Sequence, residues 1–334
     1  MDSVIQLNNI LNSFKIKASC VGYQTTDTYC SYDLALNPGT KVNDIKKFSD
    51  EISIALKATG KPNVKVIHEK GIVKLEFAAK RTNTLKLFDY FSINDDVPDG
   101  DLICLLGQDT SGNRVWMDLS KNPHMIVAGT TGSGKSTLIH NIIANLLNYN
   151  EAFIFLIDPK RIEFTKYQDS KINNVQVGYT YEEAIATLDL LLISMEYRYE
   201  LLRKGVPAKD IPYAVLIIDE FSDLIMQDKD NSFHTKLCQL AQKCRAAKIS
   251  IILSTQRPSA NIIDGTIKAN FSARIACKVA SHVDSKVILD SVGAENLLGH
   301  GDALLRDNFR FMERFQVAYT DATEICNFFG TVNK

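Results

Sequence analysis

Apolar residues recur with two different periods along the chain, and the dominant period changes near residue 100. In the first hundred residues, helical spacing covers Val4–Phe14 and Ile45–Leu56, whereas Phe14–Cys20 alternates like a half-buried strand. Two further alternating runs, Val64–Ile67 and Ile72–Phe77, flank a short polar turn and predict a hairpin. The N-terminal part is therefore expected to be a small α+β domain.

From residue 124 onward, short apolar runs alternate with longer amphipathic segments. This alternation of strands and helices is typical of a mainly parallel sheet with right-handed crossovers, so the fold class is α/β. The expected strands are Met125–Ala128, Ala152–Asp158, Ala214–Asp219, Ser250–Ser254 and Ala273–Val279, and the expected helices follow Gly134 and span Glu182–Arg203, Phe233–Ala247 and Val283–Asp290. A hairpin of Asp302–Leu305 with Phe315–Tyr319 and a helix over Asp321–Phe329 are expected to close the chain.

An acidic stretch that contains proline and glycine, Asp95–Asp101, separates the two patterns. The chain has 334 residues, which exceeds one typical domain of about 100–200 residues. We therefore expect a small α+β domain over residues 1–100 and a larger α/β domain over residues 101–334.

Composition narrows the class of protein. With 45% hydrophobic and 23% charged residues, the chain is an ordinary globular protein, not a disordered, collagen-like or coiled-coil one. No apolar run approaches the ~18–20 residues that span a bilayer, and no signal peptide follows Met1, so we expect no direct membrane insertion. The seven cysteines are odd in number and form no CxxC pair, which favours reduced thiols in a cytoplasmic protein over disulfides or a zinc site.

A phosphate-binding motif carries the clearest chemistry. Residues 129–136 fit GxxxxGK[ST], between an expected strand and an expected helix. Its glycines let backbone N–H groups surround phosphates, Lys135 is expected to reach the β- and γ-phosphates of ATP, and Ser136 is expected to ligate Mg²⁺. The predicted ATP-binding residues are Gly129, Thr130, Thr131, Gly132, Ser133, Gly134, Lys135, Ser136 and Thr137.

Two further strand ends supply candidate catalytic groups. The apolar strand Ala214–Ile218 runs into Asp219 and Glu220, at the edge of the sheet where open α/β folds bind ligands. We expect Asp219 to hold the Mg²⁺ and Glu220 to orient or deprotonate the attacking water. Gln256, after the next strand, is expected to lie near the γ-phosphate. A glutamate beside Asp219 favours hydrolysis over transfer of phosphate to an acceptor.

Several long segments together resemble the motor of FtsK/SpoIIIE-type DNA translocases, which are RecA-like hexameric P-loop ATPases. The resemblance covers nearly all of residues 100–330, and Leu36–Leu56 resembles the family's α subdomain. The segments that carry it are Pro123–Leu138, Phe155–Phe164, Val215–Ile225, Leu240–Ser259, Ile267–Val279 and Ile288–Leu305.

The resemblance implies an ATP-hydrolysing, ring-shaped hexamer that moves double-stranded DNA through its channel, with one ATP site at each subunit interface. It implies an arginine finger from the neighbouring subunit, for which Arg274 is the first candidate and Arg245 the second. DNA-contacting residues are expected on pore loops. The candidates are Lys286, Arg306 and Arg310, with Lys268 behind them. Because only the channel needs positive charge, the net charge of −1 is compatible with this partner.

The sequence also departs from the family pattern. Lys286 stands where members usually have arginine, and the loop between Leu305 and Phe315 is shorter than usual. The membrane spans and C-terminal winged-helix domain of cellular members do not occur in this sequence, which is compatible with a native motor without its own sequence reader or with an excised motor. The task stays open between DNA segregation, conjugative transfer and genome packaging. Alternative functions are a P-loop phosphotransferase or nucleotide switch that does not act on DNA, and a non-catalytic DNA-binding scaffold.

Overall fold

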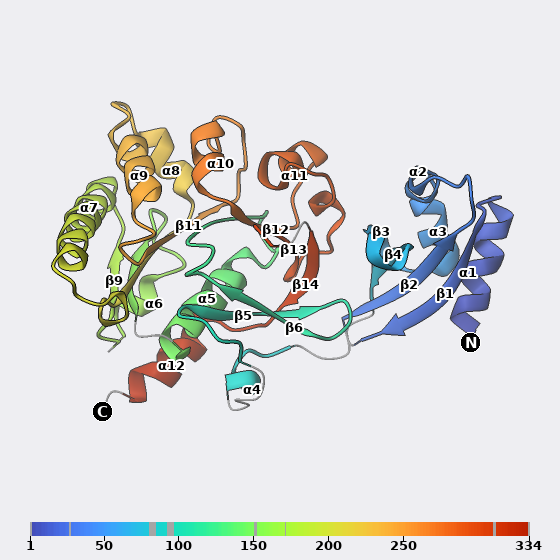
Figure 1. Ribbon diagram of the computed structural model, residues 1–334, viewed down its shortest axis with the longest axis horizontal. Coiled ribbons are helices and arrows are strands. Elements are labelled where there is room, and N and C mark those ends of the chain that lie inside the picture. The colour runs from blue at the N-terminus through green and yellow to red at the C-terminus, as the bar shows by residue number, and fades with distance from the viewer. Residues whose placement is uncertain are drawn as a thin grey trace.

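Two sheets of unequal size organise the chain, a four-stranded sheet near the N-terminus and a ten-stranded sheet after it (Figure 1). The computed structural model describes residues 2–332 except residues 27, 80–84, 92–96, 150, 151, 171, 310 and 311. Figure 1 shows the smaller sheet and its helices at one end of an elongated molecule.

The small sheet is antiparallel, with strand order β1-β2-β4-β3. Leu7 and Leu11 of the first helix pack with Leu34 and Leu75 of the sheet, so one face of the sheet is buried. The elements are α1 (Asp2–Ser13), β1 (Ala18–Thr25), β2 (Tyr29–Leu36), α2 (Val42–Lys47), α3 (Ser49–Leu56), β3 (Thr59–Ile67) and β4 (Ile72–Ala78).

Three sequence predictions for this region need correction. The first strand begins at Ala18 rather than Phe14, because the Phe14 ring stacks on Phe48 at 5.5 Å between centroids and not in the sheet. The single helix predicted over Ile45–Leu56 is two helices, since Phe48 leaves helical geometry between them. Strand β2 was not predicted, because its sequence YCSYDLAL has no clean alternation.

The large sheet has the order β6-β5-β14-β13-β12-β7-β11-β10-β8-β9. Strands from β12 to β9 are parallel, and the remaining pairs are antiparallel. The strands are β5 (Ile103–Asp109), β6 (Arg114–Asp118), β7 (His124–Ala128), β8 (Ala152–Ile157), β9 (Val175–Gly178), β10 (Tyr213–Ile218), β11 (Ile249–Thr255), β12 (Ala273–Cys277), β13 (Asp302–Arg306) and β14 (Glu313–Val317).

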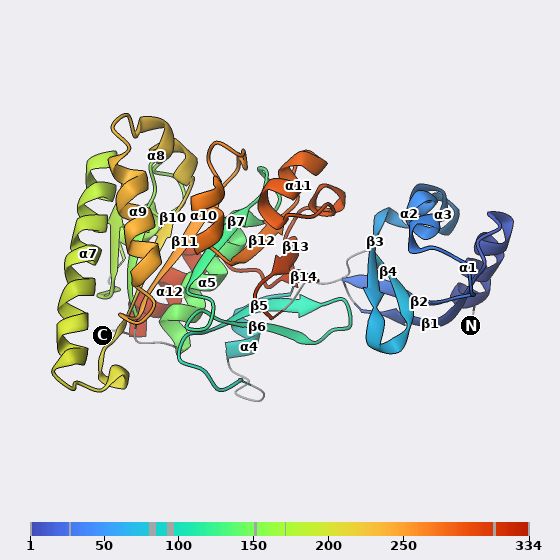
Figure 2. The same cartoon turned by 45° about the horizontal axis from the view of Figure 1, so that its top comes forward.

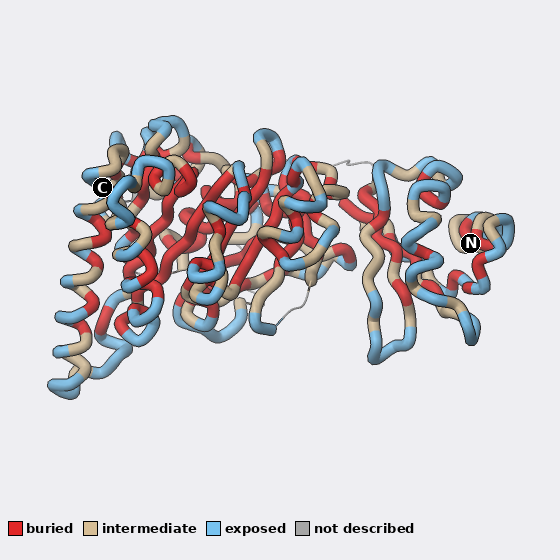
Figure 3. The backbone as a smooth tube through the Cα atoms, turned by 90° about the horizontal axis from the view of Figure 1, so that it is seen from above, coloured by how far each residue is buried: buried red, intermediate tan, exposed pale blue. Residues whose placement is uncertain are grey.

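Helices cover both faces of the large sheet. Successive residues of β7 point to opposite faces: Met125 packs with Leu138 of α5, whereas Ile126 packs in the core that contains Leu188 of α7. Figure 2 shows α7 and α9 side by side, and Figure 3 shows the buried residues concentrated in the interior, with exposed residues on the outer segments. The helices are α4 (Phe88–Phe91), α5 (Lys135–Tyr149), α6 (Thr165–Gln168), α7 (Tyr181–Arg203), α8 (Phe221–Gln227), α9 (Ser232–Lys243), α10 (Gly265–Asn270), α11 (His282–Leu289) and α12 (Ala322–Val332).

The predicted α/β class with a mainly parallel sheet is confirmed, as is the small α+β region before it. Every strand and helix predicted from residue 124 onward is present, with ends that differ by a few residues. Strand β9 and the short helices α8 and α10 were not predicted, because each is too short to show a period. Within the described residues, no helix combines the length and the apolar character needed to cross a membrane.

A buried ion pair joins the two sheets. Arg314 of β14 donates two hydrogen bonds to Asp302 of β13, at 2.9 and 2.7 Å, and a third to the backbone carbonyl of Glu76 in β4. The Tyr29 hydroxyl of β2 donates to the same aspartate at 2.7 Å. Residues after β4 already belong to the larger core, in which Leu87 is fully buried. The division at residue 100 stays a proposal.

Candidate nucleotide site

The phosphate loop lies between β7 and α5, as the motif predicts. Gly132 and Gly134 adopt positive φ angles of 75° and 99°, a region that glycine enters without strain. A Cβ atom on Gly134 would lie 2.2 Å from the backbone nitrogen of Gly301. The backbone N–H of Gly301 also donates to the carbonyl of Ser133 at 2.8 Å. Gly132 is therefore required by the turn, and Gly134 both by the turn and by the segment packed against it.

Lys135 is buried and paired with Asp219. Its Nζ lies 2.5 Å from Asp219 Oδ1 and 2.7 Å from Ser254 Oγ, and the two side chains are 3% and 4% exposed. The three residues come from the starts or ends of α5, β10 and β11, which are adjacent in space because β7, β11 and β10 are neighbouring parallel strands. The predicted convergence of Lys135 and Asp219 is therefore present, and Ser254 completes it.

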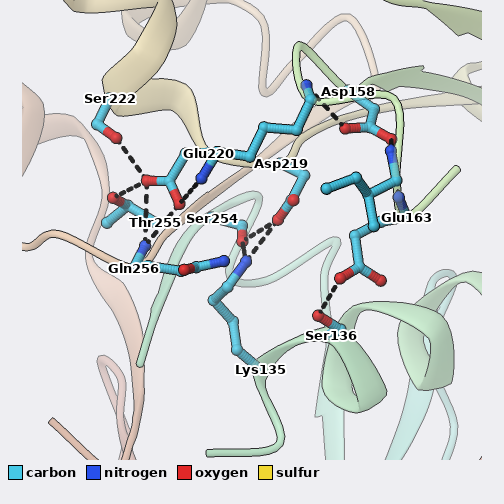
Figure 4. A network of polar contacts seen from close by, with 12 residues as sticks. Lys135, Ser136, Asp158, Glu163, Asp219, Glu220, Ser222, Ser254, Thr255 and Gln256 are labelled. Atoms are coloured by element: carbon cyan, nitrogen blue, oxygen red, sulfur yellow. Dashed lines mark hydrogen bonds and ion pairs between the residues drawn. The ribbon is translucent and has the colours of Figure 1, made fainter. Parts of the chain in front are cut away.

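Glu220 is held in a strained backbone conformation by several donors. Its φ of 50° lies in the left-handed region, which is costly for a residue with a side chain. Its carboxylate accepts hydrogen bonds from the Ser222 hydroxyl, from the Thr255 hydroxyl at 2.7 Å and from the Gln256 backbone N–H, and Lys160 Nζ lies 3.1 Å away (Figure 4). Burial raises the pKa of Glu220, but these donors outweigh it and lower the pKa below its ordinary value.

A second acid, Glu163, faces the phosphate loop and was not predicted from the sequence. The Ser136 hydroxyl donates to Glu163 Oε1 at 2.7 Å, and His140 Nε2 lies 3.4 Å from the other carboxylate oxygen. The hydrogen bond from His140 lowers the pKa of Glu163 to about 2. Asp158, at the end of β8, fixes this turn by accepting backbone N–H groups, including that of Glu163 at 2.9 Å. One sequence signal could have indicated Asp158 and Glu163: they follow β8, a strand that pairs with β10.

Lys135, Ser136, Glu163 and Gln256 line one open pocket of about 670 Å³, within the usual range for ligand pockets of about 300–1,000 Å³. Asp219 and Glu220 are buried behind Lys135 and Gln256. The pocket wall includes the phosphate loop from Thr130 to Thr137, together with Glu163 and Gln256. The Thr131 hydroxyl donates to the Gln256 side-chain oxygen at 3.2 Å, which links the two sides of the pocket. Gln256 therefore lies beside the phosphate loop, and its place near the γ-phosphate stays a prediction.

The predicted arginine finger and two predicted DNA contacts meet at a different place. Arg274 is 8% exposed, donates to the carbonyls of Phe271, Ile288 and Lys268, and pairs with Asp290. The same carboxylate pairs with Lys268 at 2.9 Å and with Arg306 at 3.1 Å. A finger reaching a neighbouring subunit would have to release these bonds, and that role of Arg274 stays a prediction.

The other predicted cations are exposed or undescribed. Lys286 lies on the exposed surface of α11, and Arg245 is exposed in the turn after α9. Arg310 lies outside the described residues. Their roles stay predictions.

Comparison with known families settles the kinship of this architecture. Residues 2–78 match the FtsK alpha domain, and residues 94–209 match the FtsK/SpoIIIE family. The chain belongs to the FtsK/SpoIIIE family. The first match covers the four-stranded sheet, and the second covers the phosphate loop, Asp158 and Glu163.

Curated relatives from this family align along most of the chain. It is 35% identical to DNA translocase FtsK of Chlamydia muridarum (strain MoPn / Nigg) over 330 residues, covering 90% of this chain and 41% of that protein. It is 36% identical to DNA translocase SftA of Bacillus subtilis (strain 168) over 321 residues, covering 90% and 34%. The chain thus spans between about a third and two fifths of the length of these two relatives.

Solved structures show the same fold at lower identity. The pCW3 conjugation coupling protein TcpA, solved as a monomer with ATPγS, matches with a TM-score of 0.69 at 21% identity, covering all of both chains. The cytoplasmic domain of the type VII secretion ATPase EccC from Thermomonospora curvata matches with a TM-score of 0.62 at 21% identity, covering 75% of this chain and 35% of that one.

Proposed function

We propose that this FtsK/SpoIIIE family protein is a cytoplasmic ATPase that acts as a ring-shaped hexamer and moves double-stranded DNA. The observation that carries the ATPase is the cluster that Lys135 forms with Asp219 and Glu220 at the ends of neighbouring strands, with Lys135 on the wall of the open pocket. Kinship with proteins named DNA translocases supports DNA as the substrate that is moved.

Phosphate binding follows from the glycine turn and from Lys135. Backbone N–H groups of the loop and of the start of α5 suit an anion, because they carry partial positive charge. Lys135 is buried and paired with Asp219, which balances its charge. A triphosphate exchanges this partner for phosphate oxygens, and the exchange avoids leaving a buried cation unpaired.

The residues present suit Mg²⁺. Oxygen donors gather beside the phosphate loop: the Ser136 hydroxyl, the Asp219 carboxylate and the Glu163 carboxylate. Mg²⁺ prefers such ligands and keeps several of its waters, so carboxylates close to the loop can hold it through water. Ser136 would bind the ion and Asp219 would hold its waters. The ion supplies neutralisation of the charge that develops on the transferring phosphate.

Glu220 is placed to handle the attacking water. Its carboxylate is ionised, since its pKa is lowered, and it lies next to Asp219 at the strand end. Four donors contact this carboxylate in the structure, and Lys160, whose side chain is partly exposed, is the cation among them. Release of Lys160 would leave Glu220 an acceptor for a water proton, while Ser222 and Thr255 keep its orientation.

The ring and the DNA contacts belong to the same proposal. Arg245 is exposed and would need less rearrangement than Arg274 to reach a neighbouring site. Lys286 is exposed on α11, where it would grip a phosphate without reading a base.

The test is the rate of ATP hydrolysis against added double-stranded DNA, with the assembly state measured on the same samples. The wild type is expected to hydrolyse ATP faster with DNA and to form rings on it. Lys135→Ala is expected to lose hydrolysis at every DNA concentration, whereas the exposed control Lys209→Ala keeps the wild-type rate. Hydrolysis that ignores DNA, from a protein that never forms a ring, would leave the ATPase but overturn the translocase.

A further inference from the structure

The nucleotide pocket extends beyond the phosphate loop, on the side away from the catalytic acids. In the sheet order, β11 and β10 lie on one side of β7, and they carry the groups around Asp219 and Glu220. Strands β12, β13 and β14 lie on the other side of β7. A triphosphate whose terminal phosphate faces the acids therefore directs its nucleoside toward β14.

A series of backbone hydrogen bonds joins the loop to that side. The N–H groups of His300 and Gly301 donate to the carbonyls of Gly132 and Ser133, at 3.1 and 2.8 Å. The carbonyl of Gly301 in turn accepts the N–H of Val317 at 2.8 Å. The pocket wall is thus continuous from the phosphate loop to the end of β14.

The wall ends at Tyr319 and at the segment that follows the small sheet. Tyr319 donates its N–H to the carbonyl of Leu85 at 2.6 Å and accepts the N–H of Leu87 at 2.9 Å. Leu85, Lys86 and Tyr319 line the same pocket as the phosphate loop. This part of the wall is supported from beneath, because Leu87 is fully buried in the larger core.

The Tyr319 ring has the properties of a stacking surface. It is 39% exposed although its backbone is fixed on both sides, and its hydroxyl donates to Asp321 at 3.2 Å. An aromatic ring held in this way offers a flat apolar face at low entropic cost. Leu85, which is half-buried, provides aliphatic surface next to it in the pocket.

We propose that Tyr319, with the extended segment Leu85–Leu87 beside it, forms the base subsite of the nucleotide pocket and stacks on the adenine of ATP. This subsite rests on the proposed ATPase function. Thr28, from the turn between β1 and β2, lines the same pocket. A bound nucleoside would therefore touch the large sheet, the connecting segment and the small sheet at once.

The test compares two probes by calorimetry in the presence of Mg²⁺. ATPγS carries base, ribose and phosphates, whereas inorganic tripolyphosphate carries phosphates alone. Tyr319→Ala is expected to weaken ATPγS binding about tenfold, the loss of one base–aromatic stack, and to leave tripolyphosphate binding unchanged. Tyr319→Phe keeps the ring and is expected to bind both probes like the wild type. Tyr197→Ala, which removes an exposed tyrosine from α7, is the matched control.

The outcomes separate this subsite from the phosphate site. Equal binding of ATPγS by the wild type and by Tyr319→Ala would overturn the subsite, as would Tyr319→Phe losing as much affinity as Tyr319→Ala. Tripolyphosphate binding by each variant reports that its phosphate loop is folded, and Tyr319→Leu, which keeps apolar bulk, repeats the test if Tyr319→Ala fails that check. A wild type that binds neither probe, or Lys135→Ala that binds both normally, would instead overturn the proposed ATPase.

Discussion

Two buried ion pairs of this protein have different roles: one includes Lys135 of the phosphate loop, and the other joins β13 to β14. Lys135 and Asp219 are 3% and 4% exposed, and Arg314 and Asp302 are each 1% exposed. The first pair is joined by one contact and borders an open pocket. The second is bidentate and closed by Tyr29.

The difference teaches that burial alone does not reveal what an ion pair does. The charges of Lys135 and Asp219 have an alternative partner, because a triphosphate and its metal ion fit the pocket beside them. Arg314 and Asp302 are instead joined to each other by two hydrogen bonds and to the small sheet through Glu76 and Tyr29. A pair that can exchange partners suits a ligand site, whereas a pair tied to both sheets fixes their arrangement.

The largest effect on stability is expected for the pair of Arg314 and Asp302. Asp302→Asn removes the charge opposite Arg314 and leaves a buried guanidinium unpaired, so unfolding should become easier by roughly 3–5 kcal/mol. Urea denaturation measures this, with Asp210→Asn at an exposed position as the control. A loss of unfolding free energy below about 1 kcal/mol would show that the Arg314–Asp302 pair does not hold the fold together.

At the open site, activity should change far more than stability. Glu220→Gln is expected to slow ATP hydrolysis by roughly 10²–10³-fold, since the amide accepts no proton from water. Its shape and most of its hydrogen bonds remain, so urea denaturation should detect little change. Single-turnover hydrolysis with saturating ATP measures the rate. A variant that hydrolyses ATP at the wild-type rate would remove Glu220 from the mechanism.

Asp290 gives an intermediate case, because three cations share a carboxylate that is 44% exposed. Burial raises its pKa, but hydrogen bonds from Lys268 and Arg274 lower it overall. With solvent screening taken into account, Asp290→Asn should cost about 1 kcal/mol of unfolding free energy at neutral pH. This advantage of the wild type should shrink as pH falls below about 4, because a lowered pKa stabilises only the ionised form. If the wild type stays more stable than Asp290→Asn by the same amount at pH 2, the ionised Asp290 carboxylate is not the source of the stability.

The smallest effect is expected at Lys286, which is exposed. Lys286→Ala should weaken DNA binding several-fold and reduce the slope of log affinity against log salt by about 0.9, the contribution of one phosphate contact. Lys286→Arg should keep the slope. Fluorescence anisotropy with duplex DNA over a range of salt concentrations measures both, and an unchanged slope in Lys286→Ala would place the DNA contact elsewhere.

Local patterns predicted the large α/β unit well. Its strands are short apolar runs and its helices carry apolar stripes, so the period of the sequence follows the structure closely from His124 onward. The phosphate loop was predictable because its glycines and Lys135 lie within eight residues. The small sheet was harder to predict. Strand β2 is stabilised by pairing with β1 and β4 on either side, and Phe14 contacts Phe48 only in the folded structure.

By itself, the sequence determined the fold class, the family, the phosphate loop, and Asp219 and Glu220 at a strand end, since each depends on neighbouring residues or on strand order. Only the tertiary structure decided which partners each charge has. In the tertiary structure Glu163 accepts a hydrogen bond from Ser136, and Arg314 pairs with Asp302. Asp290 pairs with Arg274, Lys268 and Arg306. The reason is physical: these contacts join residues far apart in the chain, and the energy of a charge depends on its burial and its partner, neither of which a local pattern contains.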